Sequence, residues 1–166
     1  MIRLHVLTAV TRPENLSRIA EAFGFWGKAD FEWHLRFDSK REHVGGQALK
    51  NAMLDEISDG WVWCLDDDTL PHKRLYAEVA KAVMAADAAA VVVSQRREDR
   101  TVLLASPDNL YVGGVDIGQA VIRRDVIGEH RIPESYAGDG EFLMAVLADR
   151  NVVYLPRVLS FHNALA

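Results

Sequence analysis

The sequence has a single cysteine, no long apolar run and no excess of basic residues. Cys64 cannot form a disulfide within the chain, so we expect a reducing, cytoplasmic location. No stretch approaches the ~20 apolar residues of a membrane span, and the first residues, with Arg3 and His5 among them, do not resemble a signal peptide. Lys and Arg number 19 against 24 Asp and Glu, a net charge of -5. We therefore expect no membrane span and no nucleic-acid partner.

The chain has enough residues and apolar side chains to build one domain. It has 166 residues, of which 49% are hydrophobic and 26% are charged, as is usual for a globular protein. Apolar or alternating stretches predict strands over 2–10, 31–37, 61–65 and 89–94. In the segments between these strands, apolar residues recur at helical spacing and predict three helices. These helices start at Pro13, after Gly45–Gly46 and at Pro71. This alternation is typical of a doubly wound, mostly parallel α/β sheet.

The second half of the chain is less regular than the first. Its apolar stretches predict short strands over 101–105, 119–123, 152–156 and 158–162. The segment "GDGEFLMAVLADRN", residues 138–151, carries apolar residues at helical spacing and predicts a further helix. The sequence thus predicts short strands and loops added to a regular parallel half, all within one small domain.

Polar side chains follow the first three predicted strands at their carboxyl ends. They are Thr11 and Arg12, then Asp38, and then Asp66, Asp67 and Asp68. Ligands of open parallel sheets bind in the crevice at the carboxyl ends of the strands. The three strand ends therefore predict one ligand-binding crevice.

The three consecutive carboxylates favour a metal site in that crevice. In an extended segment Asp66 and Asp68 point to one side and Asp67 to the other. Mg²⁺ and Mn²⁺ prefer such oxygen ligands and often share them with substrate phosphates. The alternative is a solvated turn that caps the next helix, but capping accounts for only one of the three residues. A phosphatase of the haloacid dehalogenase type would need Thr where Leu70 stands.

Five motifs occur in an order that resembles the nucleotide-sugar glycosyltransferases of GT-A fold, near the large inverting family 2. They are "TAVTRPENL" after the first strand, "LRFDS" at the end of the second, "GGQALKNAMLDEISDG", "WVWCLDDDTLPHKRL" with the Asp-x-Asp motif, and "GDGEFLMAVLADRNVVYLP". The resemblance spans nearly the whole chain. It implies a minimal single GT-A domain, 1–166, with a nucleotide-binding half over 1–95 and an acceptor-binding half over 96–166.

The resemblance assigns donor-binding roles to residues in the first half. Nucleotide contacts would come from Thr8, Thr11, Arg12, Asp38, Lys50, Asn51, Asp66 and Asp67. Asp66 and Asp68 would hold Mn²⁺ or Mg²⁺, and His162 matches a late His that some members use as a third ligand of the metal or the diphosphate. From the residues alone, Thr11 and Asp38 could equally serve as helix-cap and turn residues, and His162 could be structural.

The segment "GDGEFL" contains the candidate catalytic base. Inverting transfer needs a group that takes the proton of the acceptor hydroxyl. In the family this group is the Asp of a Glu-Asp pair before a helix; here Gly138 stands in place of the Glu and Asp139 in place of the Asp. Glu141 is the second choice. We expect the helix N-terminus to keep Asp139 ionised, although an acid in a first turn also stabilises a helix without any catalytic role.

These assignments predict a metal-dependent glycosyltransferase. It would move a sugar from a nucleoside diphosphate sugar of UDP or GDP type to an acceptor hydroxyl, with inversion. The chain is short for this fold, which implies a homodimer or a small or exposed acceptor. Two alternatives remain at this stage: a nucleotidyltransferase that makes the sugar nucleotide, although "TAVTRPENL" has no Gly, and a non-catalytic nucleotide-binding domain of the same fold.

Overall fold

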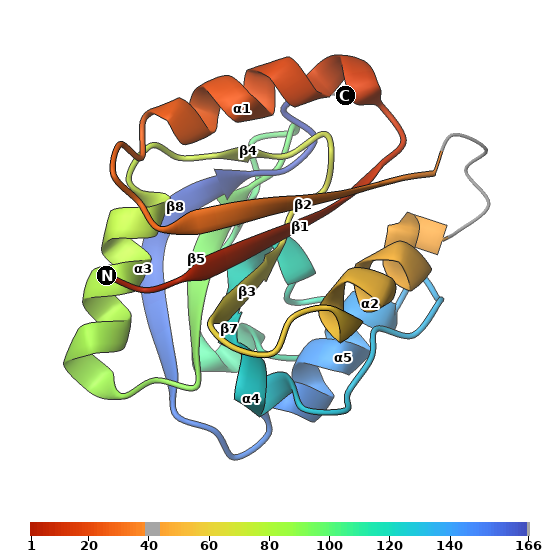
Figure 1. Ribbon diagram of the computed structural model, residues 1–166. Helices are drawn as coiled ribbons and strands as arrows, with labels where there is room; N and C mark the ends of the chain where they lie inside the picture. The colour runs from red at the N-terminus through yellow and green to blue at the C-terminus, as the bar shows by residue number, and fades with distance from the viewer. Residues whose placement is uncertain (39–43, 166) are drawn as a thin grey trace.

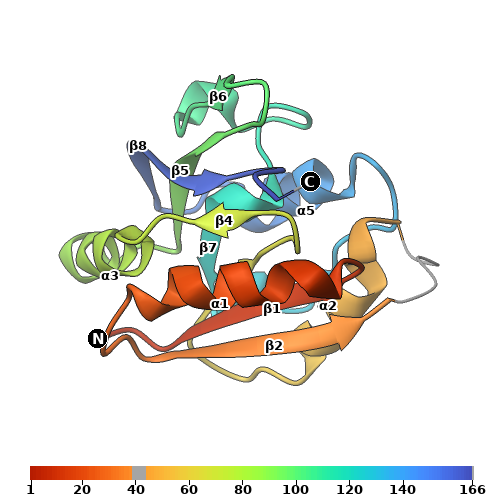
Figure 2. The same ribbon diagram turned by 90° about the horizontal axis from the view of Figure 1, so that it is seen from above.

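The computed structural model describes residues 1–38 and 44–165, and these form one 8-stranded sheet with helices on both faces (Figures 1 and 2). The strand order is β2-β1-β3-β7-β5-β8-β4, with β6 paired to β5. The strands are β1 (Leu4–Val10), β2 (Phe31–Phe37), β3 (Trp61–Cys64), β4 (Leu70–Pro71), β5 (Ala90–Arg96), β6 (Val102–Leu103), β7 (Ala120–Arg123) and β8 (Val152–Phe161).

The helices lie in two layers, one on each face of the sheet. They are α1 (Leu16–Gly24), α2 (Gln47–Asp55), α3 (Leu75–Ala86), α4 (Arg124–Ile127) and α5 (Gly138–Leu147). Short 3-10 turns occur at η1 (Pro13–Asn15), η2 (Val44–Gly46), η3 (Pro107–Asn109) and η4 (Ile117–Gln119). Helices α1 and α3 cover one face, and α2, α4 and α5 cover the other (Figure 1). No helix in the described part of the chain is long and apolar enough to cross a membrane.

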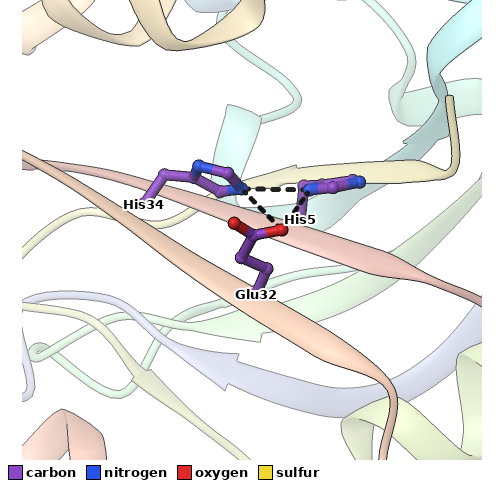
Figure 3. A group of neighbouring side chains, drawn as sticks. All are labelled: His5, Glu32 and His34. Atoms are coloured by element: carbon purple, nitrogen blue, oxygen red, sulfur yellow. Dashed lines mark hydrogen bonds and ion pairs between the residues drawn. The ribbon is translucent and has the colours of Figure 1, made fainter. Parts of the chain in front are cut away.

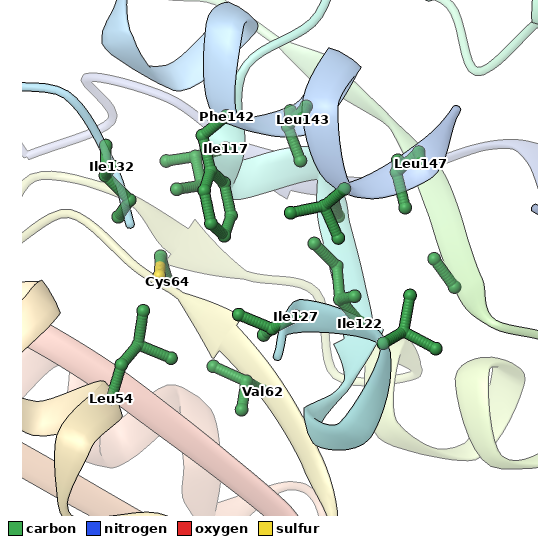
Figure 4. Packing of buried hydrophobic residues seen from close by; sticks show 14 of the residues in the cluster. Leu54, Val62, Cys64, Ile117, Ile122, Ile127, Ile132, Phe142, Leu143 and Leu147 are labelled. Carbon is green, nitrogen blue, oxygen red and sulfur yellow. The ribbon is translucent and has the colours of Figure 1, made fainter. Parts of the chain in front are cut away.

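Each face of the sheet has its own apolar core. On the α1 and α3 side, aromatic rings pack edge to face, with the centroids of Phe23 and Trp33 5.0 Å apart. On the other side, Leu54 of α2 and Phe142 of α5 meet Val62 and Ile122 of the sheet (Figure 4). Strands β3 and β5 are buried on both faces, which accounts for their continuous apolar sequences. The doubly wound arrangement predicted from the sequence is therefore present.

The sheet is only partly parallel, whereas the sequence predicted a mostly parallel one. β1 pairs in parallel with β2 and β3, and β5 with β8, but the antiparallel β7 lies between β3 and β5. The run 119–123 is apolar on both faces, and such a run does not reveal its direction or its neighbours. Because β7 and β8 come from the second half of the chain, the two halves are interleaved in one sheet.

Three local predictions also differ from the structure. Pro71 lies in β4 and not at a helix start, so α3 begins at Leu75. The segments 152–156 and 158–162 form the single strand β8, which passes through Pro156 beside a register shift in its pairing with β5. The predicted strand 101–105 is reduced to Val102–Leu103. Each difference arises from tertiary pairing and not from local propensity.

Candidate functional site

A cavity of about 280 Å³ lies where β1 and β3 end. Its lining is Ala9, Thr11, Arg12, Gly45, Gly46, Asp66, Asp67 and Asp68. The backbone of Gly46 has φ +65, and a Cβ there would meet the Ala9 side chain at 2.2 Å. Glycine is therefore required for α2 to start so close to β1. The structure brings together Thr11, Arg12 and the three Asp residues, as the strand ends predicted.

Asp66, Asp68 and His162 form a candidate metal centre beside this cavity. One ligand atom from each residue lies within 4.8 Å of the others. His162 follows the end of β8, and its backbone N–H donates to the Arg96 carbonyl at 2.9 Å. Its Nδ1 is buried and has no hydrogen-bond partner in the part of the chain that the structure describes. Two carboxylates and an unsatisfied imidazole nitrogen fit a divalent cation.

Lys50, a buried residue of α2, compensates part of the negative charge of this centre. Its ammonium lies 2.6 Å from Asp66 Oδ1, and its side chain is only 2% exposed. Burial by itself would raise the pKa of Asp66, but the Lys50 charge outweighs it, so that this pKa is lowered. The pKa of Asp68 is raised, first by burial and then by repulsion from Asp66, against the attraction of Arg12. Lys50 was predicted to flank the nucleotide; in the structure it forms an ion pair with Asp66.

Asp67 holds the loop that follows β1. Its carboxylate accepts hydrogen bonds from the Thr11 backbone N–H at 2.5 Å, the Thr11 hydroxyl at 3.0 Å and the Arg12 backbone N–H at 2.6 Å. The Arg12 guanidinium donates to Asp67 Oδ1 and to Asp68 Oδ2, each at 2.8 Å. The segment is not extended as assumed from the sequence, because Thr69 N–H donates to the Asp66 carbonyl and closes a turn. Asp67 therefore anchors this loop, and because it also lines the cavity, its contact with a nucleotide stays a prediction.

Three other residues that were predicted to contact the nucleotide sugar do not line this cavity. Thr8 is fully buried, and its hydroxyl accepts a hydrogen bond from Trp33 Nε1 at 3.0 Å. The Asn51 amide exchanges two hydrogen bonds with the backbone of Ile132, at 2.8 and 2.9 Å. Asp38 is buried at the end of β2, where its backbone N–H donates to the Val10 carbonyl at 2.8 Å. Thr8 and Asn51 therefore stabilise the fold around the crevice.

Asp139 lies in the first turn of α5, half-buried. Burial raises the pKa of its carboxyl to about 6; Asp66 and Asp116 push in the same direction, and Lys50 opposes them. The expected effect of the helix N-terminus, which would lower this pKa, is thus outweighed by burial. Oδ1 of Asp139 is buried and lacks a partner among the residues described. Glu141, by contrast, is exposed.

Gly138 is required by packing at the start of α5. A Cβ at this position would lie 2.0 Å from the Pro133 carbonyl oxygen. No side chain fits there without movement of the backbone. This contact accounts for glycine at position 138.

A second cavity, of about 350 Å³, has Asp139 in its wall. It is lined by Arg97, Val112, Gly113, Val115, Asp116, Tyr136, Ala137, Asp139 and Gly140. Tyr136 is fully exposed at its rim. Asp116 is partly engaged, because its Oδ1 accepts from the Gly118 N–H at 2.8 Å. The arrangement places a carboxyl of raised pKa in the wall of a cavity that carries both polar and apolar side chains.

Sequence reasoning missed Gln47, the first residue of α2. Its Nε2 donates to the Ser135 carbonyl at 2.9 Å, and its buried Oε1 has no partner within the described ranges. Its amide also acts on Asp139, where it lowers the pKa against the effect of burial. The one sequence signal was a polar residue directly after Gly45–Gly46, and that signal did not distinguish Gln47 from its polar neighbours on the helix.

Comparison with known proteins shows similarity in fold. No protein-family model and no curated protein matches the chain. A crystal structure of S. aureus TarS 1–349 in complex with UDP matches with TM-score 0.80 and 13% identity, covering 97% of this chain and 60% of that one. The same fragment in complex with UDP-GlcNAc gives TM-score 0.77, 12% identity and coverages of 97% and 58%. A STIV protein gives TM-score 0.56, 16% identity and coverages of 99% and 83%.

These matches support a glycosyltransferase-like fold and no specific family. The chain spans about 60% of the TarS fragment that it matches. At this level of identity the likeness concerns the arrangement of strands and helices only.

Proposed function

We propose that the protein is a metal-dependent glycosyltransferase that uses a nucleoside diphosphate sugar. The observation that carries this proposal is the group of Asp66, Asp68 and His162 next to the 280 Å³ cavity, with the raised-pKa Asp139 close enough to interact with Asp66. The metal centre, which would bind the diphosphate, thus lies next to Asp139, which would accept the proton. The complexes of TarS with UDP and UDP-GlcNAc support a donor of this chemical class.

The donor would lie in the cavity at the ends of β1 and β3. Thr11 and Arg12 line it, and their positions are fixed by Asp67. Asp66, Asp68 and His162 would hold Mn²⁺ or Mg²⁺, which would neutralise the charge on the diphosphate leaving group. The imidazole favours Mn²⁺ over Mg²⁺, because Mg²⁺ binds mainly through oxygen. Lys50 keeps Asp66 ionised for this purpose.

The acceptor would lie in the second cavity, with its hydroxyl at Asp139. A carboxyl of pKa about 6 is mostly ionised at neutral pH and still basic enough to accept a proton. As the acceptor oxygen bonds to the anomeric carbon, its proton passes to Asp139 and the bond from that carbon to the diphosphate oxygen breaks. The nucleoside diphosphate leaves on the opposite side, which gives inversion. Tyr136, exposed at the rim, would contact a sugar acceptor.

The test combines a binding screen with an activity assay. Thermal shifts would be measured with UDP, GDP, CMP and their sugars, with and without Mn²⁺, followed by assays of donor hydrolysis and sugar transfer. The proposal expects a Mn²⁺-dependent shift with one nucleoside diphosphate and release of that nucleotide from its sugar. Binding without turnover would favour a non-catalytic domain. Formation of a sugar nucleotide from a nucleoside triphosphate would favour a nucleotidyltransferase.

A further inference from the structure

A second group of metal-binding side chains lies near the amino ends of β1 and β2, away from the cavities described above. It consists of His5 on β1 and of Glu32 and His34 on β2 (Figure 3). His5 lies opposite Glu32 in the parallel pairing of the two strands. Glu32 and His34 are two residues apart on one strand, so the three side chains share one face of the sheet.

The ligand atoms of the three side chains converge on one point. His5 Nδ1 and His34 Nε2 lie 3.0 Å apart. Glu32 Oε2 lies 3.8 Å from the first nitrogen and 3.9 Å from the second. The nearest point that is equidistant from the three atoms lies about 2.1 Å from each, which is the length of a bond from Zn²⁺ to imidazole nitrogen or carboxylate oxygen. In the structure the two rings share a hydrogen bond, which an ion bound there would replace. A four-coordinate ion would lie out of the plane of the three atoms, so the side chains would shift slightly on binding.

We propose that His5, Glu32 and His34 form a binding site for Zn²⁺ or a similar borderline transition metal, with water as the fourth ligand. Two imidazoles and one carboxylate are typical of such ions and not of Mg²⁺ or Ca²⁺, which prefer oxygen. The donor set therefore differs in kind from the oxygen-rich centre of Asp66 and Asp68. It does not depend on the glycosyltransferase proposal.

The surroundings of the site are consistent with metal binding. Exposure of the side chains increases from 4% for His5 to 19% for His34 and 55% for Glu32, so an ion can reach the site from solvent on the Glu32 side. Arg3 Nη2 donates a hydrogen bond to Glu32 Oε2 at 3.4 Å, in a pair of half-exposed side chains. Groups bonded to metal-bound carboxylates commonly have an orienting role.

Metal binding should stabilise the pairing of β2 with β1 at the edge of the sheet. Strand β2 is at one end of the strand order, and in the described structure it pairs with β1 alone. An edge strand is held by fewer hydrogen bonds than a central one and opens more easily. A metal bonded to His5 on β1 and to two residues on β2 would join the strands near their start. Zn²⁺ should therefore slow local opening of β2.

The test uses metal-stripped protein, ZnCl₂ and the variant His34→Asn. Zn²⁺ bound per chain would be measured by equilibrium dialysis, and amide hydrogen exchange of β2 with and without Zn²⁺. We expect His34→Asn to lose one bound Zn²⁺ relative to the wild type, with at least ~100-fold weaker binding at that site, and to lose the protection of β2 by Zn²⁺. Circular dichroism checks that the variant is folded, and Glu32→Gln, at an exposed position, provides a second variant.

Two controls separate this site from other histidines. His130→Asn removes an exposed imidazole elsewhere and should change neither quantity. His162→Asn removes the imidazole of the Asp66–Asp68 centre and should leave the protection of β2 by Zn²⁺ intact. Equal Zn²⁺ binding and equal protection of β2 in wild type and His34→Asn would overturn the proposal. So would a wild-type protein whose β2 exchange does not respond to Zn²⁺.

Discussion

The ammonium of Lys50 lies 2.6 Å from the carboxylate of Asp66, in an ion pair whose lysine side chain is only 2% exposed. Lys50 lowers the pKa of Asp66 and also acts on Asp139, whose pKa it lowers against the effect of burial. One buried charge on α2 thus influences both the candidate metal centre and the candidate base.

Removal of the Lys50 charge should destabilise the protein. Lys50→Met leaves Asp66 without its partner, and loss of one member of a buried pair costs roughly 2–4 kcal/mol when the other remains partly exposed. Lys73→Met, at an exposed position, is the matched control and should change stability by less than ~0.5 kcal/mol. Denaturant titration measures both variants. A Lys50→Met protein as stable as the control would mean that the ion pair contributes nothing.

Asp67 and Asp68 should have separable roles. Asp67→Ala removes the buried acceptor of three N–H groups and a hydroxyl, so it should lower the free energy of unfolding by about 2–4 kcal/mol. Asp68→Ala should cost less stability but abolish Mn²⁺-dependent stabilisation by a nucleoside diphosphate. Thermal shifts with and without Mn²⁺ distinguish the two. If Asp68→Ala keeps the full Mn²⁺-dependent shift, Asp68 is not a metal ligand.

The pH dependence of transfer should follow the ionisation of Asp139. Its pKa is about 6, so kcat/KM should rise as pH increases through 6 and level off above 7. Asp139→Asn should lower transfer by at least ~10²-fold and remove this dependence, while nucleotide affinity stays nearly unchanged. Glu141→Gln, at an exposed residue, should have little effect. If Glu141→Gln abolishes transfer and Asp139→Asn does not, Glu141 is the base.

Stability provides a control for Asp139 that needs no substrate. Because its folded pKa is raised, the native protein holds this proton when the unfolded chain has lost it. The contribution of Asp139 to stability is therefore full below pH 4 and is lost as pH rises through 6. Asp139→Asn should be more stable than the wild type at pH 8, by about 1–3 kcal/mol, and equally stable near pH 4. Denaturant titrations at the two pH values measure the difference.

Gly138 should not tolerate a side chain. Gly138→Ala places a Cβ 2.0 Å from the Pro133 carbonyl oxygen, so the start of α5 must move, at a cost of about 2–4 kcal/mol. Gly24→Ala is the control, since Gly24 is also helical and a Cβ there has open space. It should be neutral or stabilising by up to ~1 kcal/mol. Equal stability of the two variants would show that the contact at Gly138 is relieved without cost.

The sequence predicted the elements whose signals are local. The alternation over 31–37 gave β2 with its observed bounds, and the polar residues after the strands located the crevice. The position of β7 between β3 and β5 was not predictable, because pairing partners depend on the rest of the sheet. The contacts of Asp67 with Thr11 and Arg12 were not predicted, because a turn, closed by Thr69 N–H and the Asp66 carbonyl, replaces the extended chain that period-two reasoning assumes.

The candidate metal ligands could be proposed from their residue types alone, whereas the partners of the buried polar side chains could not be predicted. Asp66, Asp68 and His162 carry donor groups that suggest a cation wherever they meet. Lys50 and Asn51 were assigned to the nucleotide, but Lys50 pairs with Asp66 and Asn51 with the backbone of Ile132, partners that are far away in sequence. The pKa of Asp139 depends on burial, which only the three-dimensional packing determines.

Calorimetric titration of UDP and GDP into the protein, with and without Mn²⁺, tests the central claim most directly. We expect one nucleotide to bind with a stoichiometry of one when Mn²⁺ is present, to bind at least ~10-fold more weakly without it, and to lose this difference in Asp68→Ala. Absence of binding by both nucleotides with Mn²⁺ present, or identical affinities with and without the ion, would contradict a metal-dependent site for a nucleoside diphosphate sugar.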